Sequence, residues 1–393
     1  MRSITLTTST SIALLASAAA TAGTQTYTIT DLGTIAGANE VFEPGSVAAG
    51  VSANIVVGYS VTDLPKRNFH AYRSVGGVMQ DLGVLPDDQH SMAFATNAAG
   101  DVVGVSYKLG EIYVHGVLWT AAGGTVNLGN VEPHDINASG AIAASAAVPG
   151  AIGTTHATLI VGGSSTDLGT LGGPSSMALG INDSNWVVGQ AMLSDARTTR
   201  AFVYRNGSML DLGTLGGVNS RALDVNGLRI VGVADTATGG TQHATMWTMT
   251  AAGALGTTTD LGTLRGANSS SAYAVNADGV AVGISGDAAA KFSGGTVIDL
   301  NTAIAPNQNW HLSRALGIDA SGRIVGVGKH LGLQRGFLLT PQVSADLNGD
   351  GAVNAADLAI LLGDWGSSSS SADLNGDGTV DAADLAILLG AWT

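Results

Sequence analysis

The sequence predicts a mainly β protein: a seven-bladed β-propeller of four-stranded repeats, each about 45 residues long, followed by a small α-helical module. Three observations predict this fold class. The triplet Asp-Leu-Gly recurs at intervals of 39 to 50 residues when two weaker versions are included. Each interval contains four short segments of strand character. The last 48 residues differ, because they hold two near-identical copies of a loop followed by a helical pattern.

The first two strands of each repeat are predicted from a hairpin signal. A short apolar segment ends in an Asn-containing turn, and a segment such as Val-Val-Gly at 56–58, 102–104 and 187–189 follows at once. Asn and Gly tolerate positive φ and are favoured between two antiparallel strands. The asparagines at this position are therefore interpreted as turn formers: Asn97, Asn137, Asn182, Asn226 and Asn276.

The third strand of each repeat begins at a recurring histidine, and the fourth strand ends at Asp-Leu-Gly. Four of the eight histidines occupy this position: His70, His115, His156 and His243. Because they recur once per repeat around a ring, they are not expected to share a metal ion. Each is expected to stabilise its blade by pairing with a neighbouring turn or with the Asp of Asp-Leu-Gly. That Asp is expected to form an Asx turn in six copies: Asp31, Asp81, Asp167, Asp211, Asp260 and Asp299.

The two ends of the repeat region predict ring closure. The first Asp-Leu-Gly strand, Tyr27–Gly33, has no unit before it, and the last unit, ending at Gly336–Thr340, lacks its own closing strand. The N-terminal strand is therefore expected to complete the last blade. The alternatives are an open β-solenoid or two β-sandwiches, although a solenoid needs capping ends that the sequence does not show.

The repeat segments also resemble a known family. The DLG, LGG (171–173 and 215–217), VVG and His-Ala-Phe-like segments are similar to the HAF-type extracellular repeat. The resemblance covers about residues 25–340 and is clearest at 167–210 and 211–259. It implies an extracellular protein without indicating a particular activity.

Each C-terminal copy opens with a loop of the EF-hand type. Residues 346–366 and 373–393 are identical at 17 of 21 positions. Such a loop needs side-chain oxygens at positions 1, 3, 5 and 12, a carbonyl at 7, a ligand or water at 9, and Gly at 6. The first copy supplies Asp346, Asn348, Asp350, the carbonyl of Ala352, Asn354 and Asp357. The second supplies Asp373, Asn375, Asp377, the carbonyl of Thr379, Asp381 and Asp384. An all-oxygen donor set suits calcium, so two Ca²⁺ ions are predicted.

One helix is predicted after each loop. Leu358, Leu361, Leu362 and Trp365 have the spacing of an apolar helical stripe, and Leu385, Leu388, Leu389 and Trp392 repeat it. The two stripes are expected to pack on each other. Because so small a core gives little stability, calcium binding is expected to be coupled to folding.

This duplicated unit resembles a type I dockerin domain over residues 346–393. The resemblance implies calcium-dependent docking to a cohesin-like domain or a cell-surface scaffold. In dockerins, partner choice rests on loop positions 10 and 11, which here are Ala355, Ala356, Ala382 and Ala383. Hydroxylated residues are usual at these positions, so an apolar docking surface is a further possibility.

The sequence divides into four predicted segments. Residues 1–22 are typical of a secretion signal, with an early Arg2, an apolar run and a small-residue cleavage site. The propeller is predicted at 23–340, a linker at 341–345 and the dockerin-like domain at 346–393. A secreted chain with no Cys suggests an extracellular bacterial protein. No apolar run is long enough to span a membrane, and a net charge of −14 argues against a nucleic acid partner.

The sequence assigns no catalytic residue. It contains no G-x-S-x-G, H-E-x-x-H or phosphate-binding loop. Glu40 and Glu43 lie outside the repeat pattern and are weak candidates for a glycosidase acid pair. Trp186 and Trp310 also break the pattern and are candidates for stacking on a sugar, whereas Trp119 and Trp247 share a repeat position and are expected in the core.

Three functional hypotheses follow. The leading one is a secreted, non-catalytic propeller that binds a glycan or a protein and is anchored through its calcium-dependent dockerin. The second is a dockerin-borne carbohydrate-active hydrolase or lyase in polysaccharide catabolism. The third is a structural surface-layer protein, which would neither bind glycans nor turn them over.

Overall fold

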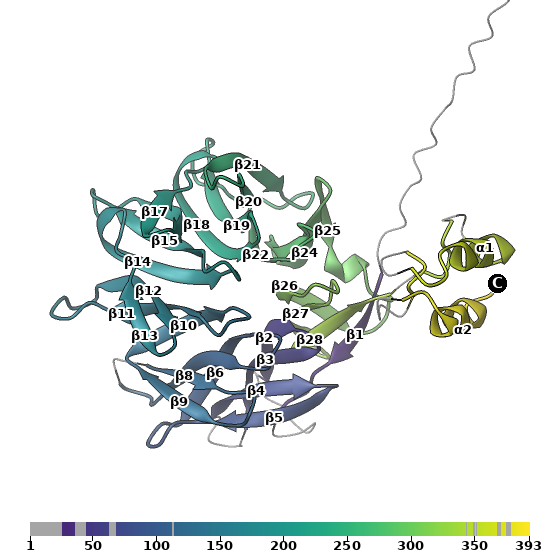
Figure 1. Ribbon diagram of the computed structural model, residues 1–393, viewed down its shortest axis with the longest axis horizontal. Coiled ribbons are helices and arrows are strands. Elements are labelled where there is room, and N and C mark those ends of the chain that lie inside the picture. The colour runs from purple at the N-terminus through teal and green to yellow at the C-terminus, as the bar shows by residue number, and fades with distance from the viewer. Residues whose placement is uncertain are drawn as a thin grey trace, which may run out of the picture. The chain divides into compact units, whose positions relative to one another are not determined.

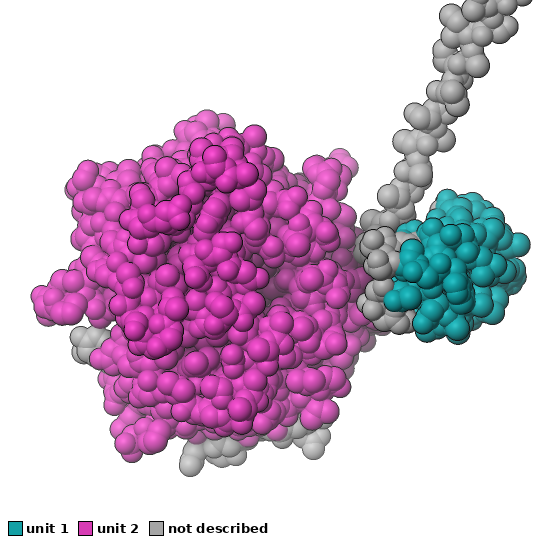
Figure 2. Space-filling view, in the orientation of Figure 1, with its two compact units in different colours: residues 1–25, 343–393 teal, residues 26–342 magenta. Residues whose placement is uncertain are grey.

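The computed structural model describes residues 26–35, 45–62, 68–111, 114–342, 344–348, 350, 352–367, 371–374 and 379–393. Two compact units are present, one of residues 26–342 and one containing residues 343–393 (Figure 2). The predicted signal at 1–22, Glu40, Glu43, Asn375 and Asp377 lie outside the described residues.

The larger unit is a seven-bladed β-propeller, as predicted (Figure 1). Each blade is a four-stranded antiparallel sheet. In six blades the strands follow one another in the chain from the centre of the ring outward, and in the seventh the outer strand comes from the N-terminus. Blade 1 is β2 (Ser46–Ser52), β3 (Ile55–Val61), β4 (Phe69–Val75) and β5 (Val78–Gly83). Blade 2 is β6 (His90–Thr96), β7 (Val102–Tyr107), β8 (His115–Trp119) and β9 (Thr125–Gly129). Blade 3 is β10 (Val131–Ile136), β11 (Ile142–Ala147), β12 (Thr155–Val161) and β13 (Ser164–Asp167).

The remaining blades follow the same order. Blade 4 is β14 (Gly172–Ile181), β15 (Val187–Leu193), β16 (Thr199–Arg205) and β17 (Ser208–Asp211). Blade 5 is β18 (Gly216–Asn226), β19 (Arg229–Thr236), β20 (Gln242–Met249) and β21 (Leu255–Gly262). Blade 6 is β22 (Ser270–Val275), β23 (Ala281–Ser285), β24 (Ala288–Ser293) and β25 (Thr296–Asp299), and the short 3₁₀ helix η1 (Leu300–Thr302) follows it. Blade 7 is β26 (Trp310–Ile318), β27 (Ile324–His330), β28 (Leu333–Pro341) and β1 (Tyr27–Asp31).

The N-terminal strand closes the ring, which confirms the prediction. β1 pairs antiparallel with β28 from Tyr27–Pro341 to Asp31–Phe337. The Nζ atom of Lys291, on β24, lies 3.2 Å from the hydroxyl of Tyr27, so β1 also contacts blade 6. Closure leaves no long exposed edge between the first and last blades.

Every inner strand contains a β-bulge at the same place. The pairing between the first and second strands shifts by one residue in all seven blades. The shift explains the glycine of Val-Val-Gly in the second strand. A Cβ on Gly58, Gly104 or Gly189 would collide with a carbonyl oxygen of the inner strand. Six blades have a glycine at this position and blade 3 has Ala144, so the bulge leaves room for only a very small residue there. The bulge also turns one extra residue of each inner strand toward the centre.

The hydrophobic core lies between neighbouring blades. One cluster joins Val188 and Ala201 of blade 4 to Trp247 and Met249 of blade 5. Trp119 and Trp247 are 3% and 0% exposed, so their assignment to the core is confirmed. The apolar residues of the short strands thus face the adjacent blade on both sides.

The smaller unit contains two nine-residue helices, α1 (Ala355–Gly363) and α2 (Ala382–Gly390). Each begins with a capping box, formed by Asn354 and Asp357 in the first helix and by Asp381 and Asp384 in the second. No helix among the described residues is long and apolar enough to cross a membrane.

The predicted apolar stripes are only half correct. Leu361 and Leu388 are fully buried, and Leu358 and Leu385 pack on the same cluster. Four other members are 44 to 52% exposed: Leu362, Trp365, Leu389 and Trp392. Each helix ends before its tryptophan, and loop residues such as Val353 and Val380 complete the core instead.

Candidate functional site

A central channel runs through the propeller and contains a cavity of about 830 Å³. All seven inner strands contribute to its wall. This volume is in the range of small-molecule binding sites in proteins. The channel is therefore the first candidate site in the larger unit.

The bulges place one side chain from each blade on the channel wall. The seven residues are Ala49, Phe94, His134, Leu179, Leu223, Tyr273 and Leu316. We call this set the bulge ring. Most of its members are aliphatic or aromatic, so the bulge ring forms an apolar section of the channel wall.

The residue after each bulge is small in five blades and acidic in two. The small residues are Gly50, Ala95, Gly180, Ala274 and Gly317, and the acidic residues are Asp135 and Asp224. The blades approach closely here, because a Cβ on Gly180 would lie 3.0 Å from the Cα of Asp224. Two carboxylates thus break the repeat where the other blades have almost no side chain.

Each of these carboxylates links two inner strands. Asp135 accepts the N–H of Ile136 at 2.8 Å and that of Ile181, in the next blade, at 2.8 Å. Asp224 accepts the N–H of Val225 at 2.7 Å and that of Val275 at 2.8 Å. Burial raises the pKa of Asp135 to about 8, with a further contribution from the charge of Asp224. Burial likewise raises the pKa of Asp224 to about 6.

The asparagines of the hairpin turns lie at one end of the channel. Their turn-forming role is confirmed where their Oδ1 atoms accept a backbone N–H four residues later, as Asn137 does from Ala141 at 2.9 Å. They also link blades: Asn97 donates to the carbonyl of Asn137 at 3.2 Å, and Asn137 donates to that of Asn182 at 3.0 Å. This second role was not predicted from the sequence.

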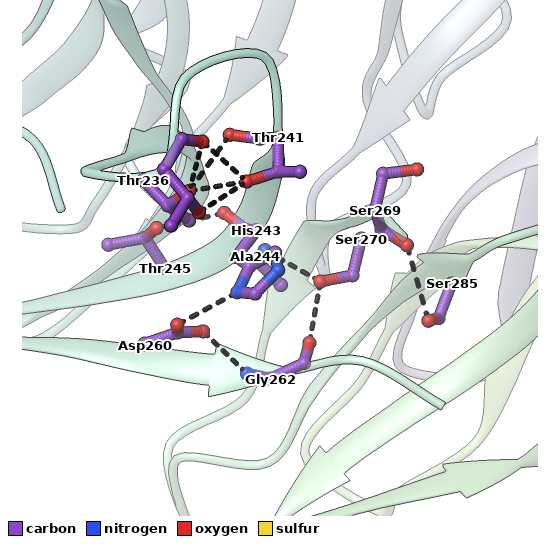
Figure 3. Close-up of polar contacts among 11 residues, drawn as sticks. Thr236, Thr241, His243, Ala244, Thr245, Asp260, Gly262, Ser269, Ser270 and Ser285 are labelled. Carbon is purple, nitrogen blue, oxygen red and sulfur yellow. Dashed lines mark hydrogen bonds and ion pairs between the residues drawn. The ribbon is translucent and has the colours of Figure 1, made fainter. Parts of the chain in front are cut away.

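The recurring histidines pair with aspartates, as predicted. The Nδ1 atoms of His70, His156 and His243 lie 2.8 to 2.9 Å from carboxylate oxygens of Asp81, Asp167 and Asp260 (Figure 3 shows the last pair). His115 instead reaches Asp88 at 3.1 Å, since Asn127 occupies the aspartate position of its repeat. His330 was missed by sequence reasoning, yet it pairs at 2.8 Å with Asp31 of the closing strand.

The Asp-Leu-Gly aspartates form the expected Asx turns. Asp260 Oδ1 accepts the N–H of Gly262 at 2.7 Å, and Asp31, Asp81, Asp167 and Asp211 make the same bond at 2.7 to 2.8 Å. The recurring His and Asp side chains therefore have structural partners within their own blades.

A recurring serine connects each of five blade pairs and was also missed. Ser270 Oγ accepts the N–H of Ala244 at 2.8 Å and donates to the carbonyl of Gly262 at 2.6 Å (Figure 3). Ser46, Ser91, Ser176 and Ser220 make equivalent pairs of bonds. The signal was a serine seven to thirteen residues after the glycine of Asp-Leu-Gly.

In the first calcium-type loop, several expected donors are connected by hydrogen bonds within the loop. Asp350 Oδ2 lies 2.9 Å from Asn348 Nδ2, and Asp346 Oδ1 accepts the N–H of Asp350 at 3.1 Å. Asp357 Oδ1 accepts the N–H groups of Leu347 and Asn348 at 2.7 and 3.1 Å, which fixes the carboxylate of the helix against the loop. Hydrogen bonds from backbone N–H groups, that of Asn354 first, lower the pKa of Asp357.

This donor set fits calcium by its chemistry. It consists of carboxylate, amide and carbonyl oxygens, the ligands that a hard cation prefers. Among the described residues, no three His, Asp or Glu side chains are already grouped closely enough to share an ion. The remaining donors would therefore be the two asparagines and the carbonyl of Ala352, all in the same loop.

The second loop is described in part. Asp384 Oδ2 accepts the N–H of Asp381 at 2.8 Å, as in the first copy. Asp373 and Thr379 are also described, whereas Asn375 and Asp377 are not. The alanines at the predicted docking positions, Ala355, Ala356, Ala382 and Ala383, are exposed at the helix starts.

The two tryptophan candidates do not form one site. Trp186 follows β14 and has the Arg205 guanidinium 5.3 Å from its ring centre. Trp310 begins β26 and stacks on His330 with ring centres 4.6 Å apart. They belong to different blades and sit at opposite ends of inner strands, and each has one ring face occupied by a protein group.

Comparison with known proteins identifies the smaller unit. Residues 344–390 match the dockerin type I domain. The chain therefore carries a type I dockerin, a class of cohesin-binding module that generally binds calcium and occurs in secreted or cell-surface proteins. No curated protein matches the chain.

Several solved structures are similar to parts of this chain. The β-propeller domain of the trilobed protease from Pyrococcus furiosus is 9% identical, with a TM-score of 0.45, and the match covers 63% of this chain and 80% of that one. TolB from Acinetobacter baumannii is 12% identical, with a TM-score of 0.39 and coverages of 76% and 63%. A prolyl endopeptidase is 12% identical, with a TM-score of 0.47 and coverages of 72% and 45%. These values carry no inference about activity.

Proposed function

We propose that this chain is a secreted, calcium-binding protein whose dockerin anchors a non-catalytic, ligand-binding propeller to a cohesin-like partner on a scaffold or cell surface. The match of residues 344–390 to the dockerin type I domain carries this proposal. The assignment of the blades to HAF-type repeats, and the signal at 1–22, rest on the sequence segments alone.

Two calcium ions are proposed, one for each loop. Bound calcium supplies a divalent charge that offsets the clustered carboxylates. Asp346, Asn348, Asp350, Asn354 and Asp357, with the carbonyl of Ala352, would hold the first ion. The second would use the corresponding set from Asp373 to Asp384. Residues 346–393 contain eight Asp and no Lys, Arg or Glu, so their mutual repulsion favours cation binding.

The exposed faces of the two helices are proposed as the docking surface. At 100° per residue, Ala355, Ala359 and Leu362 lie within about 60° of one another on α1. Ala382, Ala386 and Leu389 repeat this face on α2. Because Leu362 and Leu389 are each 52% exposed, both copies offer an apolar patch flanked by small residues. A repeated surface of this kind could bind one partner in either of two orientations.

The propeller is proposed to bind a glycan or a protein. The recurring His and Asp groups are engaged in blade contacts, which supports a scaffold with binding functions rather than a catalytic ring. Trp186 and Trp310 are half-buried against core clusters and are kept as candidates for sugar stacking.

Binding to a panel of immobilised type I cohesin domains, with and without EGTA, tests the anchoring role. Calcium-dependent binding is expected for residues 23–393. The double variant Asp346→Ala, Asp373→Ala should lose it, and Leu362→Ser with Leu389→Ser should weaken it while leaving the helical circular dichroism intact. Asp364→Asn, a charge change outside the loop donors, is the matched control. Absence of binding to every cohesin in calcium would contradict the anchoring proposal.

Incubation of the same protein with a polysaccharide panel tests the propeller. Retention of the protein on a polysaccharide without release of new reducing ends is expected. Release of reducing ends would establish instead the alternative of a carbohydrate-active hydrolase or lyase.

A further inference from the structure

The wall of the propeller channel combines the apolar bulge ring with two carboxylates at positions where the other blades have Gly or Ala. The bulge ring provides Phe94, Tyr273 and three leucines, all half-buried and facing the cavity. Asp135 and Asp224 follow the bulges of blades 3 and 5. The other five blades have Gly or Ala there, so the blade contacts themselves do not require an acid at this position.

The charge balance of the channel is negative. The acidic and basic side chains of the lining are Asp135, Asp183, Asp224, Asp319, Arg323 and His134. The guanidinium of Arg323 is bound by Asp319, with Nε and Nη2 at 2.7 and 2.5 Å from Oδ2. Burial lowers the pKa of His134, which leaves this side chain neutral at pH 7. Three carboxyl groups in the cavity wall thus have no cationic partner among the described lining residues.

A second observation in the wall concerns His134 itself. This histidine is the bulged residue immediately before Asp135, and it stacks on Phe94 with ring centres 6.2 Å apart. Its Nε2 atom is buried and has no hydrogen-bond partner among the described residues. Because this nitrogen is buried, His134 contributes its ring, stacked on Phe94, to the apolar wall of the channel.

From this geometry we infer that the channel binds a small organic ammonium compound. Its charged nitrogen would donate hydrogen bonds to the free lone pairs of Asp135 and Asp224, and its apolar body would contact the bulge ring. Charge-assisted hydrogen bonds in a site of low dielectric are strong, and an ammonium group is also attracted to the faces of Phe94 and Tyr273.

The apolar bulge ring favours an organic cation over a metal ion as the ligand of the channel. Asp135 and Asp224 already use their oxygens to accept four backbone N–H groups. Calcium needs six to eight oxygen ligands, and the side chains of the bulge ring supply only the hydroxyl oxygen of Tyr273. An amine needs only two or three acceptors on one side and apolar contacts on the other.

A matched series of probes tests this inference with residues 23–393 in calcium-free buffer at pH 8.5. Isothermal titration calorimetry would compare 2-phenylethylamine, 2-phenylethanol and phenylacetate. These compounds share a benzyl group and differ in the charge of the polar end. The amine is expected to bind with a stoichiometry of one, and the alcohol and the acid about tenfold more weakly or not at all.

Variants place the binding in the channel. Asp135→Asn with Asp224→Asn should weaken amine binding by about tenfold or more, whereas Asp195→Asn, in an exposed loop, should leave it unchanged. If the double variant does not fold, Ala49→Phe fills the channel from the smallest position of the bulge ring and should block binding. The inference is overturned if the amine does not bind, if the alcohol binds equally well, if Ala49→Phe binds normally, or if CaCl₂ displaces the amine from the channel.

Discussion

Ser270→Ala is expected to destabilise the propeller by removing one of the serine bridges between blades. The Ser270 side chain is only 3% exposed and connects the N–H of Ala244 to the carbonyl of Gly262. In the variant, both backbone groups lose their partner. The N–H of Ala244 is buried, so water cannot replace the hydroxyl there.

The expected loss of unfolding free energy follows from these two bonds. A buried donor or acceptor left unsatisfied costs about 1–3 kcal/mol. The carbonyl of Gly262 is partly accessible and can bind water, so its contribution is at the lower end. We therefore expect a loss of about 2–4 kcal/mol, with little added cavity cost because only one oxygen atom is removed.

Equilibrium urea unfolding would measure this loss, followed by fluorescence of the buried Trp119 and Trp247. Ser269→Ala is the matched control, because Ser269 is exposed and its hydrogen bond to Ser285 uses only the backbone carbonyl. The control should change stability by less than about 0.5 kcal/mol. Equal stabilities for the two variants would show that the serine bridges do not hold the blades together.

Three further changes have expected outcomes. Deletion of residues 27–33 removes the strand that completes blade 7 and should abolish the cooperative unfolding transition or lower its midpoint strongly; an unaltered melting curve would rule out closure by β1. EGTA should unfold α1 and α2 while the β signal of the propeller persists, as followed by circular dichroism; unchanged helical signal would contradict calcium-coupled folding. Burial raises the pKa values of Asp135 and Asp224 to about 8 and 6, so the folded chain keeps protons that the unfolded chain releases above about pH 4. Stability from these groups is therefore fully present below about pH 4 and falls as the pH rises toward 8, and Asp135→Asn should flatten this slope in urea titrations at pH 5 to 8.5; an unchanged slope would contradict the assigned environment.

Much of the propeller could be predicted because its signals are local. Asp-Leu-Gly marks the end of a strand wherever it occurs, since the Asp carboxylate closes a turn on the glycine two residues later. The histidine in the preceding strand faces this turn across one hairpin, so its partner also lies within the repeat. The extra strand at the N-terminal end of the repeat region and the missing strand of the last unit were enough to predict closure by β1.

The channel could not be predicted from the same signals. Asp135 and Asp224 lie in segments that otherwise match the repeat, and they were not separated from the turn chemistry around them. Their environment depends on the bulge before each of them, on the approach of the next blade, and on each other across blade 4. The neighbouring blade and the second carboxylate are both distant in the sequence from each aspartate.

The dockerin unit shows the same division. The spacing of the loop donors predicts calcium ligation, because a twelve-residue loop brings its own oxygens together. The i, i+3, i+4, i+7 pattern predicted one buried stripe, but the burial of Leu361 and the exposure of Leu362 depend on where the helix ends and on which loop residues cover it.

By itself, the sequence determined the repeat, the number of blades, the closing strand and the calcium-type loops, because each depends on contacts within one repeat or on a count of repeats. The tertiary structure alone decided which side chains face the central channel and which faces of the two helices are exposed. Those properties arise where seven blades converge and where short helices meet loops distant in the chain, and no periodicity in the sequence encodes them.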